Sequence, residues 1–397
     1  MMNTNQDIKI AQYYFYPTMN CSLSCDHCFI EEAMRHDKTR MSVEQFKIVV
    51  DKYAEHFVNS NIQNAEMTIM GGEPTLVDAE FYQEVIPYIR RKFDFEKTGK
   101  YAFITLMTNF MHLSKLEKIA DLFDFIATSY EPNRFDERKF KVWEQNIKDW
   151  VARGKRVVLS FTTTPDVMDK GVELFDYFYD IGVRNFQINN AVPGGSYLEH
   201  SMSKDDYAVY LSDKNAEHLK FSRKRKRYSI SNNMHMGFQA ESDYYVLITE
   251  WLLNKSKEDG GLRVDPIHGM IADLLHDQEL GDIACGSGKG FSTRTDGLVT
   301  GCAAEIGNST PLSFGNIFED SIVDIENSPV RTQQLFANER LPKTCLACEF
   351  VDNCKGGCQQ RSRLWDPKSG LECHGLKSFL SYIQSNNEKL KRISDER

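Results

Sequence analysis

The feature that most constrains this fold is a regular alternation of short apolar runs with amphipathic stretches in the first half of the chain. Runs rich in apolar and β-branched residues, typical of buried strands, occupy 11–17, 66–72, 101–109, 124–131, 155–164 and 185–190. Stretches with helical spacing of apolar residues occupy 42–57, 79–93, 113–123, 141–154 and 171–182. Six such units in series predict an α/β fold with a parallel sheet, either open or curled into a partial (β/α)6 barrel.

Polar and glycine-rich segments follow each predicted strand. They lie at 21–28, 71–74, 108–110, 129–135, 162–165 and 188–195. Ligands of parallel sheets bind at the carboxyl ends of the strands. We therefore expect these segments to line one shared pocket.

The composition narrows the class of protein. The chain has 397 residues, 41% of them hydrophobic, and a net charge of −9, which argues against nucleic acid as the main partner. No apolar run approaches the roughly 20 residues of a membrane helix, and no signal peptide is evident, so we expect a cytoplasmic protein without a membrane partner. The basic run Arg223 to Arg227 is either a solvated surface or a landing site for an acidic peptide or leader segment.

The ten cysteines form two groups, and their spacing indicates metal binding rather than disulfides. The first group, Cys21, Cys25 and Cys28, has the spacing C-x3-C-x2-C. A structural zinc site needs a fourth ligand, and His27 is wedged awkwardly between two of the cysteines. A cubane iron–sulfur cluster on three thiolates would instead leave one iron open.

This motif, followed by "GGEP" after the second predicted strand, resembles the signature of the radical SAM enzymes. The resemblance implies that the open iron binds S-adenosylmethionine (SAM) and that reductive cleavage of SAM gives a 5′-deoxyadenosyl radical. It also implies that "GGEP" cradles the amino group of SAM, where Glu73 would accept from an ammonium. The residues that we expect to bind SAM are Gly71, Gly72, Glu73, Pro74, Asn109, Ser129, Glu131, Arg134, Thr163 and Asn189. Arg134 and Arg138 are candidates for a carboxylate contact, and the alternative for each is a plain surface arginine.

The second group of cysteines resembles the SPASM domain, a C-terminal extension of many radical SAM enzymes. Cys285 is followed by Gly297 and Cys302, and four later cysteines have the spacing C-x2-C-x5-C-x3-C before a last one. The resemblance implies two auxiliary [4Fe–4S] clusters, and hence three clusters in the chain. The outer cluster would take Cys345, Cys348, Cys354 and Cys373. The inner cluster would take Cys285, Cys302 and Cys358, with one iron that is either capped by another group or open to substrate.

The resemblance predicts an enzyme, and it leaves the substrate open. The first hypothesis is hydrogen abstraction from a peptide, leading to cross-linking or oxidation, as in ribosomal-peptide maturases. Alternatives are the same chemistry on a small molecule, sulfatase-maturase-like oxidation, or a non-catalytic iron–sulfur protein. Sulfatase maturases usually carry an aspartate just after the second SPASM cysteine, where this chain has Ala303. Glu305 is then the candidate base, unless it is an ordinary solvated carboxylate.

The predicted organisation is a radical SAM partial TIM barrel at residues 8–195 and a small iron–sulfur SPASM domain at 283–376. A bridging region at 196–282 connects them, and a helical tail occupies 377–397. An electron donor such as flavodoxin or ferredoxin is an expected partner of a reductive enzyme of this kind.

Overall fold

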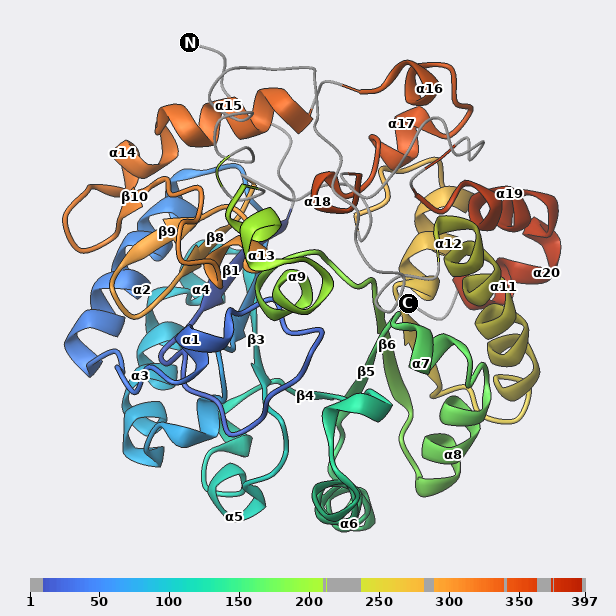
Figure 1. Cartoon of the computed structure of the whole chain (residues 1–397), viewed down its shortest axis with the longest axis horizontal. Helices are drawn as coiled ribbons and strands as arrows, with labels where there is room; N and C mark the ends of the chain where they lie inside the picture. The colour runs from blue at the N-terminus through green and yellow to red at the C-terminus, as the bar shows by residue number, and fades with distance from the viewer. Residues whose placement is uncertain are drawn as a thin grey trace.

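The structure is a computed structural model, and it describes residues 10–209, 212, 237–281, 289–338, 341–362, 373 and 375–394. These residues form a sheet with the strand order β10-β9-β8-β1-β2-β3-β4-β5-β6-β7 (Figure 1). Its strands are β1 (Ile10–Phe15), β2 (Asn64–Ile69), β3 (Tyr101–Met107), β4 (Phe125–Ser129), β5 (Val158–Thr162), β6 (Asn185–Asn189), β7 (Arg263–Asp265), β8 (Phe291–Thr293), β9 (Leu298–Thr300) and β10 (Gly315–Asn316).

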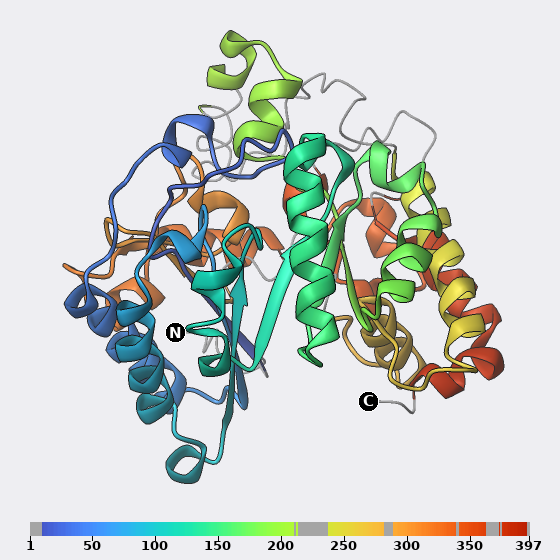
Figure 2. The same ribbon diagram turned by 90° about the horizontal axis from the view of Figure 1, so that it is seen from below.

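All six strands expected from the sequence are present. Strands β1 to β7 are parallel neighbours in chain order, with Ile10 opposite Asn64 and Asn64 opposite Tyr101. The sheet is curved rather than flat (Figure 2), which brings the carboxyl ends of its strands toward one region. The predicted α/β fold with a mostly parallel sheet is therefore confirmed.

Long amphipathic helices cover the outer face of the sheet. They are α2 (Val43–Asn59), α3 (Ala79–Lys92), α6 (Glu137–Ala152) and α8 (Glu173–Ile181). Helix α2 begins with a capping box between Ser42 and Gln45, and α8 ends at Gly182 in the left-handed conformation. Both ends follow from the sequence, because the capping residues stand beside the apolar pattern that they close.

One expected helix is shorter than its pattern. Residues 113–123 form α5 (Leu113–Leu116) and the 3₁₀ turn η2 (Ala120–Leu122) instead of one helix. The Asp124 carboxylate that follows accepts a hydrogen bond from Ile104 N of β3, at 2.7 Å. This tie to the sheet and the burial of Leu116, Ile119 and Phe123 favour the tighter turn.

Segments outside the first half extend both edges of the same sheet. Strand β7 adds beside β6, and β8 pairs in parallel with β1 before β9 and β10 continue antiparallel. The sequence did not predict these four strands, because each is only two or three residues long. The proposed division into a barrel, a bridge, a SPASM domain and a tail stays a prediction, since one sheet joins the first three.

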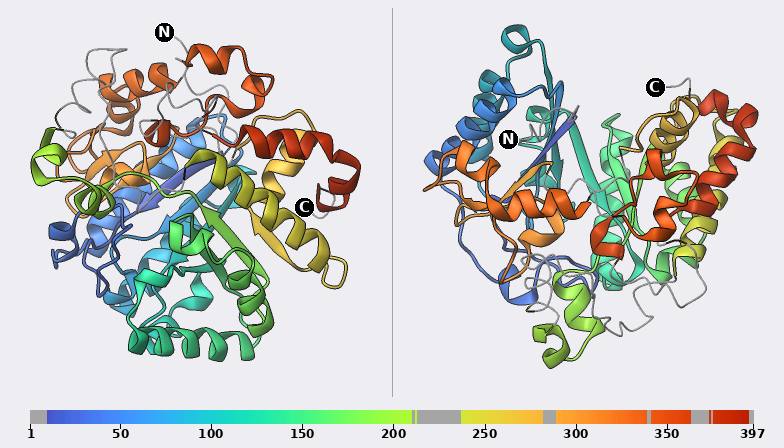
Figure 3. Two further views of the ribbon diagram at one scale, coloured as in Figure 1. Left: turned by 45° about the vertical axis from the view of Figure 1, so that its right-hand side comes forward. Right: turned by 90° about the horizontal axis from the view of Figure 1, so that it is seen from above.

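Two pairs of helices stand together beyond β7. Helix α11 (Phe238–Lys255) packs against α19 (Lys377–Ser385), and α12 (Ile267–Leu275) packs against α20 (Asn387–Ser394) (Figure 3). Helices α11 and α12 both lie in the predicted bridging region at 196–282. The expected tail is helical, while the basic run Arg223 to Arg227 lies outside the described residues.

Further helices and turns, most of them short, lie elsewhere in the described chain. They are α1 (Glu32–Arg35), η1 (Pro74–Leu76), α4 (Phe95–Thr98), η3 (Pro132–Arg134), α7 (Pro165–Met168), α9 (Gly195–Ser201), α13 (Ala303–Ile306), α14 (Ile322–Glu326), α15 (Pro329–Asn338), α16 (Lys343–Leu346), α17 (Val351–Cys354) and α18 (Gln359–Ser362). In the described part of the chain, no helix is both long enough and apolar enough to cross a membrane.

Candidate active site

The first three cysteines lie on the loop that leaves β1. The Cys21 Sγ accepts a hydrogen bond from Leu23 N, and the Cys28 Sγ accepts one from Ile30 N, both at 3.4 Å. Burial raises the pKa of all three thiols, that of Cys25 to about 12. Buried thiols of this kind ionise when a metal compensates the charge, and backbone N–H donors stabilise the resulting thiolates.

The donor set fits an iron–sulfur cluster better than a single ion. Within the described residues, no three cysteine, histidine or carboxylate side chains are placed to hold a metal ion. A cluster does not need that convergence, because each of its irons takes its own thiolate. Three thiols on one loop, two of them with backbone donors, meet this requirement.

The "GGEP" turn packs directly on the segment that precedes Cys21. The amides of Gly72 and Glu73 donate to Thr18 O at 3.1 Å and to Asn20 O at 2.7 Å. A Cβ on Gly72 would approach Asn20 O to 2.2 Å, so only glycine allows this contact. The turn therefore lies beside the cysteine loop, as its position after β2 predicted.

Glu73 is buried, and its carboxylate is largely occupied by the protein. Its Oε1 accepts from the amide and hydroxyl of Thr75, at 2.8 and 2.6 Å, and from Thr108 Oγ1 at 2.8 Å. Its Oε2 accepts from Asn109 N at 2.6 Å. A carboxylate has about four lone-pair positions, two on each oxygen, so only Oε2 retains one for an ammonium. Glu73 thus fixes the turn in addition to any contact with a ligand.

Asn109 connects this turn to the cysteine loop. Its Nδ2 donates to Ser22 Oγ at 3.2 Å, one residue after Cys21. Its Oδ1 accepts from Met111 N at 3.0 Å, which orients the amide. The exits of β2 and β3 therefore meet the loop after β1, as the shared-pocket prediction requires.

The exit of β4 carries a second cluster of polar side chains, formed by Ser129, Glu131 and Arg134. Arg134 Nη1 donates to Ser129 Oγ at 2.6 Å and to Glu131 Oε2 at 3.2 Å. Burial alone would raise the pKa of Glu131, but His27, Arg134 and Thr162 outweigh it and hold the pKa at about 2. The structure thus brings together three of the predicted residues, whereas Arg138 is exposed on α6.

His27 also belongs to this group, which the sequence did not indicate. Its Nε2 lies 3.2 Å from Glu131 Oε2, so the ring faces the β4 exit. The His27 Nδ1 and the Arg134 Nε are buried and have no hydrogen-bond partner among the described residues. Both atoms are therefore available to a ligand beside the three cysteines.

Thr163 and Asn189 lie at the exits of β5 and β6. Thr163 N donates to Asn189 O at 2.8 Å, and Thr163 Oγ1 donates to Glu241 Oε1 at 3.2 Å. Glu241 is buried on α11 and pairs with Arg361 of α18. Neither charged residue stands in a motif, so sequence reasoning had no signal for this link.

Four of the C-terminal cysteines lie within electrostatic reach of one another. Burial is the largest cause that raises the pKa of Cys345 to about 11 and that of Cys354 to about 12. Cys373 and Cys348 add to both shifts, and Cys373 Sγ accepts from Gly375 N at 3.1 Å. These are the four residues predicted for the outer cluster. Cys285, predicted for the inner cluster, lies outside the described residues.

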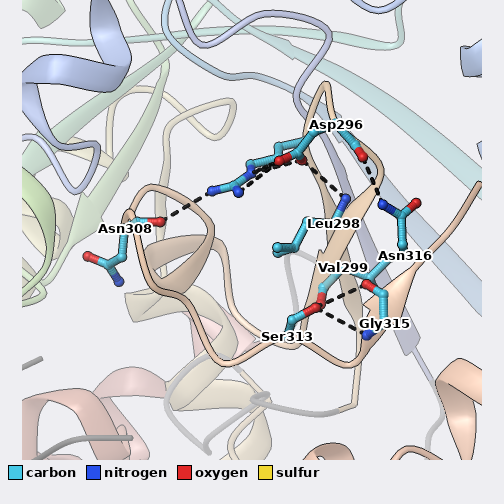
Figure 4. Close-up of polar contacts among 8 residues, drawn as sticks. Asp296, Leu298, Val299, Asn308, Ser313, Gly315 and Asn316 are labelled. Atoms are coloured by element: carbon cyan, nitrogen blue, oxygen red, sulfur yellow. Dashed lines mark hydrogen bonds and ion pairs between the residues drawn. The ribbon is translucent and has the colours of Figure 1, made fainter. Parts of the chain in front are cut away.

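Cys302 follows the hairpin that β8 and β9 form (Figure 4). The Arg294 guanidinium binds the Asp296 carboxylate, with Nη2 to Oδ2 at 2.8 Å, and donates to Asn308 O at 3.2 Å. Asn316 Nδ2 donates to Asp296 O at 3.0 Å, which ties β10 to the turn. Gly297 in this turn has φ +83°, and a Cβ there would meet the Asn316 side chain at 2.3 Å. The glycine of the SPASM spacing is therefore a steric requirement.

Helix α13, which follows Cys302, packs on the first cysteine loop. Glu31 N donates to Gly307 O at 2.9 Å, and Tyr16 Oη donates to Ala303 O at 3.2 Å. Glu305 on this helix is only 2% exposed, and Gln360 donates to its carboxylate. The interpretation of Glu305 as a solvated loop carboxylate is therefore wrong.

Comparisons with known proteins agree with this site. The 4Fe-4S single cluster domain family matches residues 12–146, and the SPASM iron-sulfur cluster-binding domain family matches residues 285–349. An uncharacterized protein of Methanothermobacter thermautotrophicus is 26% identical over 219 residues, 51% of this chain and 78% of that protein. A cysteine-type anaerobic sulfatase-maturating enzyme of Clostridium novyi is 30% identical over 73 residues, 18% of this chain and 19% of the enzyme.

Solved structures share the fold over nearly the whole chain. Native anSMEcpe with bound AdoMet and Kp18Cys peptide has a TM-score of 0.72 at 15% identity, over 98% of this chain and 100% of that chain. Streptococcus suis SuiB bound to precursor peptide SuiA has a TM-score of 0.50 at 18% identity, over 89% of this chain and 72% of that chain. The fold, the cysteine loop and the two family matches define an iron–sulfur enzyme. This chain belongs to the radical SAM enzymes that carry a SPASM domain.

Proposed function

We propose that this enzyme abstracts hydrogen from a peptide and that the product is a cross-linked or oxidised peptide. The observation that carries the proposal is the packing of α13 on the first cysteine loop, through Glu31 N to Gly307 O. This contact sets residues of the C-terminal region beside the site where SAM is expected. The peptide itself is supported by the likeness to anSMEcpe and SuiB, whose structures contain bound peptides.

The chain would hold three [4Fe–4S] clusters and SAM. Cys21, Cys25 and Cys28 would bind the first cluster, and the C-terminal cysteines would bind the two auxiliary clusters as predicted. When bound, the first cluster and SAM would supply the reductive cleavage of SAM, which gives a 5′-deoxyadenosyl radical. The protein's own part is to orient SAM through the predicted residues of the "GGEP" turn and of the strand exits.

Glu305 is the candidate proton acceptor for the oxidised substrate carbon. It is buried, lies three residues after Cys302, and is held by Gln360. Burial keeps water away from the carboxylate and fixes its position, two properties that a catalytic base needs.

Sulfatase-maturase-like oxidation is a second candidate, and the likeness to the Clostridium novyi enzyme favours it. Ala303 lacks the carboxylate expected directly after Cys302, and Glu305 would have to take its place. A small-molecule substrate is the alternative with least support from the comparisons. We also propose a cytoplasmic location and reduction by a flavodoxin or ferredoxin.

The test begins with anaerobic reconstitution of the chain with iron, sulfide, SAM and a strong reductant. We expect 5′-deoxyadenosine, measured by liquid chromatography and mass spectrometry, well above the level given by a Cys21→Ala, Cys25→Ala, Cys28→Ala variant. Equal amounts from both proteins would refute the radical SAM role.

The substrate is tested next. A precursor peptide encoded beside this gene should lose two hydrogens on incubation with the reconstituted enzyme. Sulfatase-derived cysteine and serine peptides and a set of sugars and nucleosides run in parallel. Modification of a small molecule but of no peptide would overturn the peptide assignment.

A further inference from the structure

Two buried hydrogen-bond donors near the ends of the strands lack an acceptor. They are Oη of Tyr197, on α9, and Nε of Arg361, on α18. Tyr197 is fully buried and Arg361 is 4% exposed, yet neither atom has a hydrogen-bond partner among the described residues. Leaving a buried donor unpaired costs about 1–3 kcal/mol, so buried donors are nearly always paired. Two such atoms in one region indicate a place for a missing acceptor.

Each donor belongs to a segment next to one of the two groups of cysteines. Tyr197 N donates to Cys28 O at 3.1 Å, so α9 rests on the first cysteine loop. Arg361 comes three residues after Cys358, and its neighbour Gln360 contacts Glu305. The segment of α13 contacts both helices, since Gly195 N of α9 donates to Asn308 Oδ1 at 3.3 Å and Gln360 of α18 donates to Glu305. A substrate that reaches both groups of cysteines would pass this place.

The Arg361 guanidinium is held from its far side. Its Nη2 donates to Glu241 Oε2, and Glu241 Oε1 accepts from Thr163 Oγ1 at 3.2 Å. The guanidinium also lies over the Phe238 ring, 5.3 Å from its centre. Because these contacts fix the planar group, the direction of Nε is set before any ligand arrives.

Tyr197 and Arg361 also interact electrostatically. Burial raises the pKa of the Tyr197 phenol, and the charge of Arg361 lowers it. Burial likewise lowers the pKa of Arg361 to about 10, and Tyr197 opposes that shift. The two side chains are therefore neighbours in the interior.

We propose that Tyr197 Oη and Arg361 Nε together bind an amide carbonyl oxygen of the peptide substrate. The proposal rests on the proposed function, because it presumes that the substrate is a peptide. The local charge favours a neutral acceptor. Glu241 already compensates the charge of Arg361, and the Glu305 carboxylate lies beside the same helix, so an added carboxylate would be a third buried negative charge.

Small probes test the subsite without turnover. Crystals of the reconstituted full chain are soaked in N-methylacetamide, which carries an amide carbonyl, or in acetate at the same concentrations. We expect the N-methylacetamide oxygen within hydrogen-bond distance of both Tyr197 Oη and Arg361 Nε, and no acetate there. Acetate on these atoms would overturn the neutral-acceptor assignment, and neither probe on them would overturn the subsite.

Variants give the control for this experiment. Tyr197→Phe removes only the hydroxyl and should weaken binding of N-methylacetamide roughly threefold to tenfold, the range of one neutral hydrogen bond. Ser292→Ala removes another buried hydroxyl, on β8, that has no hydrogen-bond partner in the described part of the chain, and it should leave probe binding unchanged. Equal occupancy in the Tyr197→Phe and unaltered crystals would contradict the proposal. The proposed function is tested separately, by the formation of 5′-deoxyadenosine. If no 5′-deoxyadenosine forms, the proposed function fails, and the soaking experiment still tests the subsite.

Discussion

Replacing Glu73 with glutamine tests whether this carboxylate holds the "GGEP" turn in place in addition to its expected contact with SAM. In the structure the carboxylate accepts four hydrogen bonds from protein donors, three on Oε1 and one on Oε2. Glutamine can keep its oxygen toward the three donors, but its NH₂ group then faces the amide of Asn109. The substitution thus removes one charge-assisted bond and weakens three others.

The magnitude follows from these contacts. A hydrogen bond to a charged group contributes about 1.5–3 kcal/mol, and a neutral one about 1 kcal/mol. Losing one such bond and weakening three others would lower the free energy of unfolding by about 3–5 kcal/mol. Removing a buried charge is favourable and offsets part of this loss. We expect a net loss of about 2–4 kcal/mol of folding stability for Glu73→Gln.

Stability and SAM affinity are measured on the same samples. Thermal unfolding under anaerobic conditions should show a midpoint several degrees lower than that of the unaltered chain. Calorimetry of SAM binding should show weaker affinity, because the turn that carries Gly71 and Gly72 is displaced. Glu319→Gln, at an exposed position, is the matched control and should change neither quantity. A Glu73→Gln protein with lower SAM affinity and unchanged stability would refute the structural role of the Glu73 carboxylate.

Three further predictions concern other parts of the molecule. Gly72→Ala should disrupt SAM binding and lower stability by about 1–3 kcal/mol, since its Cβ would overlap Asn20 O, whereas Gly260→Ala, with open space around it, should be neutral in the same assays. Burial, with Arg331 and Lys100, lowers the pKa of His56 to about 3, so the unfolded chain binds a proton first as pH falls below about 6.5. Unfolding in urea should therefore show a loss of about 2 kcal/mol between pH 6.5 and 5 that His56→Gln lacks, and equal slopes would contradict the assignment. Iron analysis of the oxygen-sensitive protein should give about twelve irons per chain and about eight after Cys345→Ser with Cys348→Ser, while about four in the unaltered chain would remove the SPASM clusters.

Much of the fold could be predicted from the sequence because local patterns specify it. The six parallel strands appear where apolar runs stand between helical patterns, and local sequence also sets helix ends, with the Ser42 capping box at the start of α2 and Gly182 at the end of α8. Strands β7 to β10 could not be predicted. Each has at most three residues, and β7 and β8 join the sheet through partners far away in the chain, whereas β9 and β10 continue from β8 through nearby partners.

The candidate site shows the same division. Cysteine spacing and "GGEP" identified the ligands expected for the clusters and SAM, because metal and cofactor chemistry requires those residue types at short separations. The pairing of His27 with Glu131, and that of Arg361 with Glu241, join residues from different elements. A local sequence pattern cannot predict such a contact, because the two partners are far apart in the sequence and no regular spacing relates them.

By itself, the sequence determined the class of this protein: a parallel α/β sheet with thiols grouped for iron–sulfur clusters at the strand ends. Only the tertiary structure decided what surrounds those thiols. It showed that Glu305 is buried, that Glu73 is mostly occupied by its own turn, and that Tyr197 Oη and Arg361 Nε are buried donors with no acceptor among the described residues. The physical reason is that burial and hydrogen bonding depend on every neighbour in space, whereas spacing along the chain records only the neighbours in sequence.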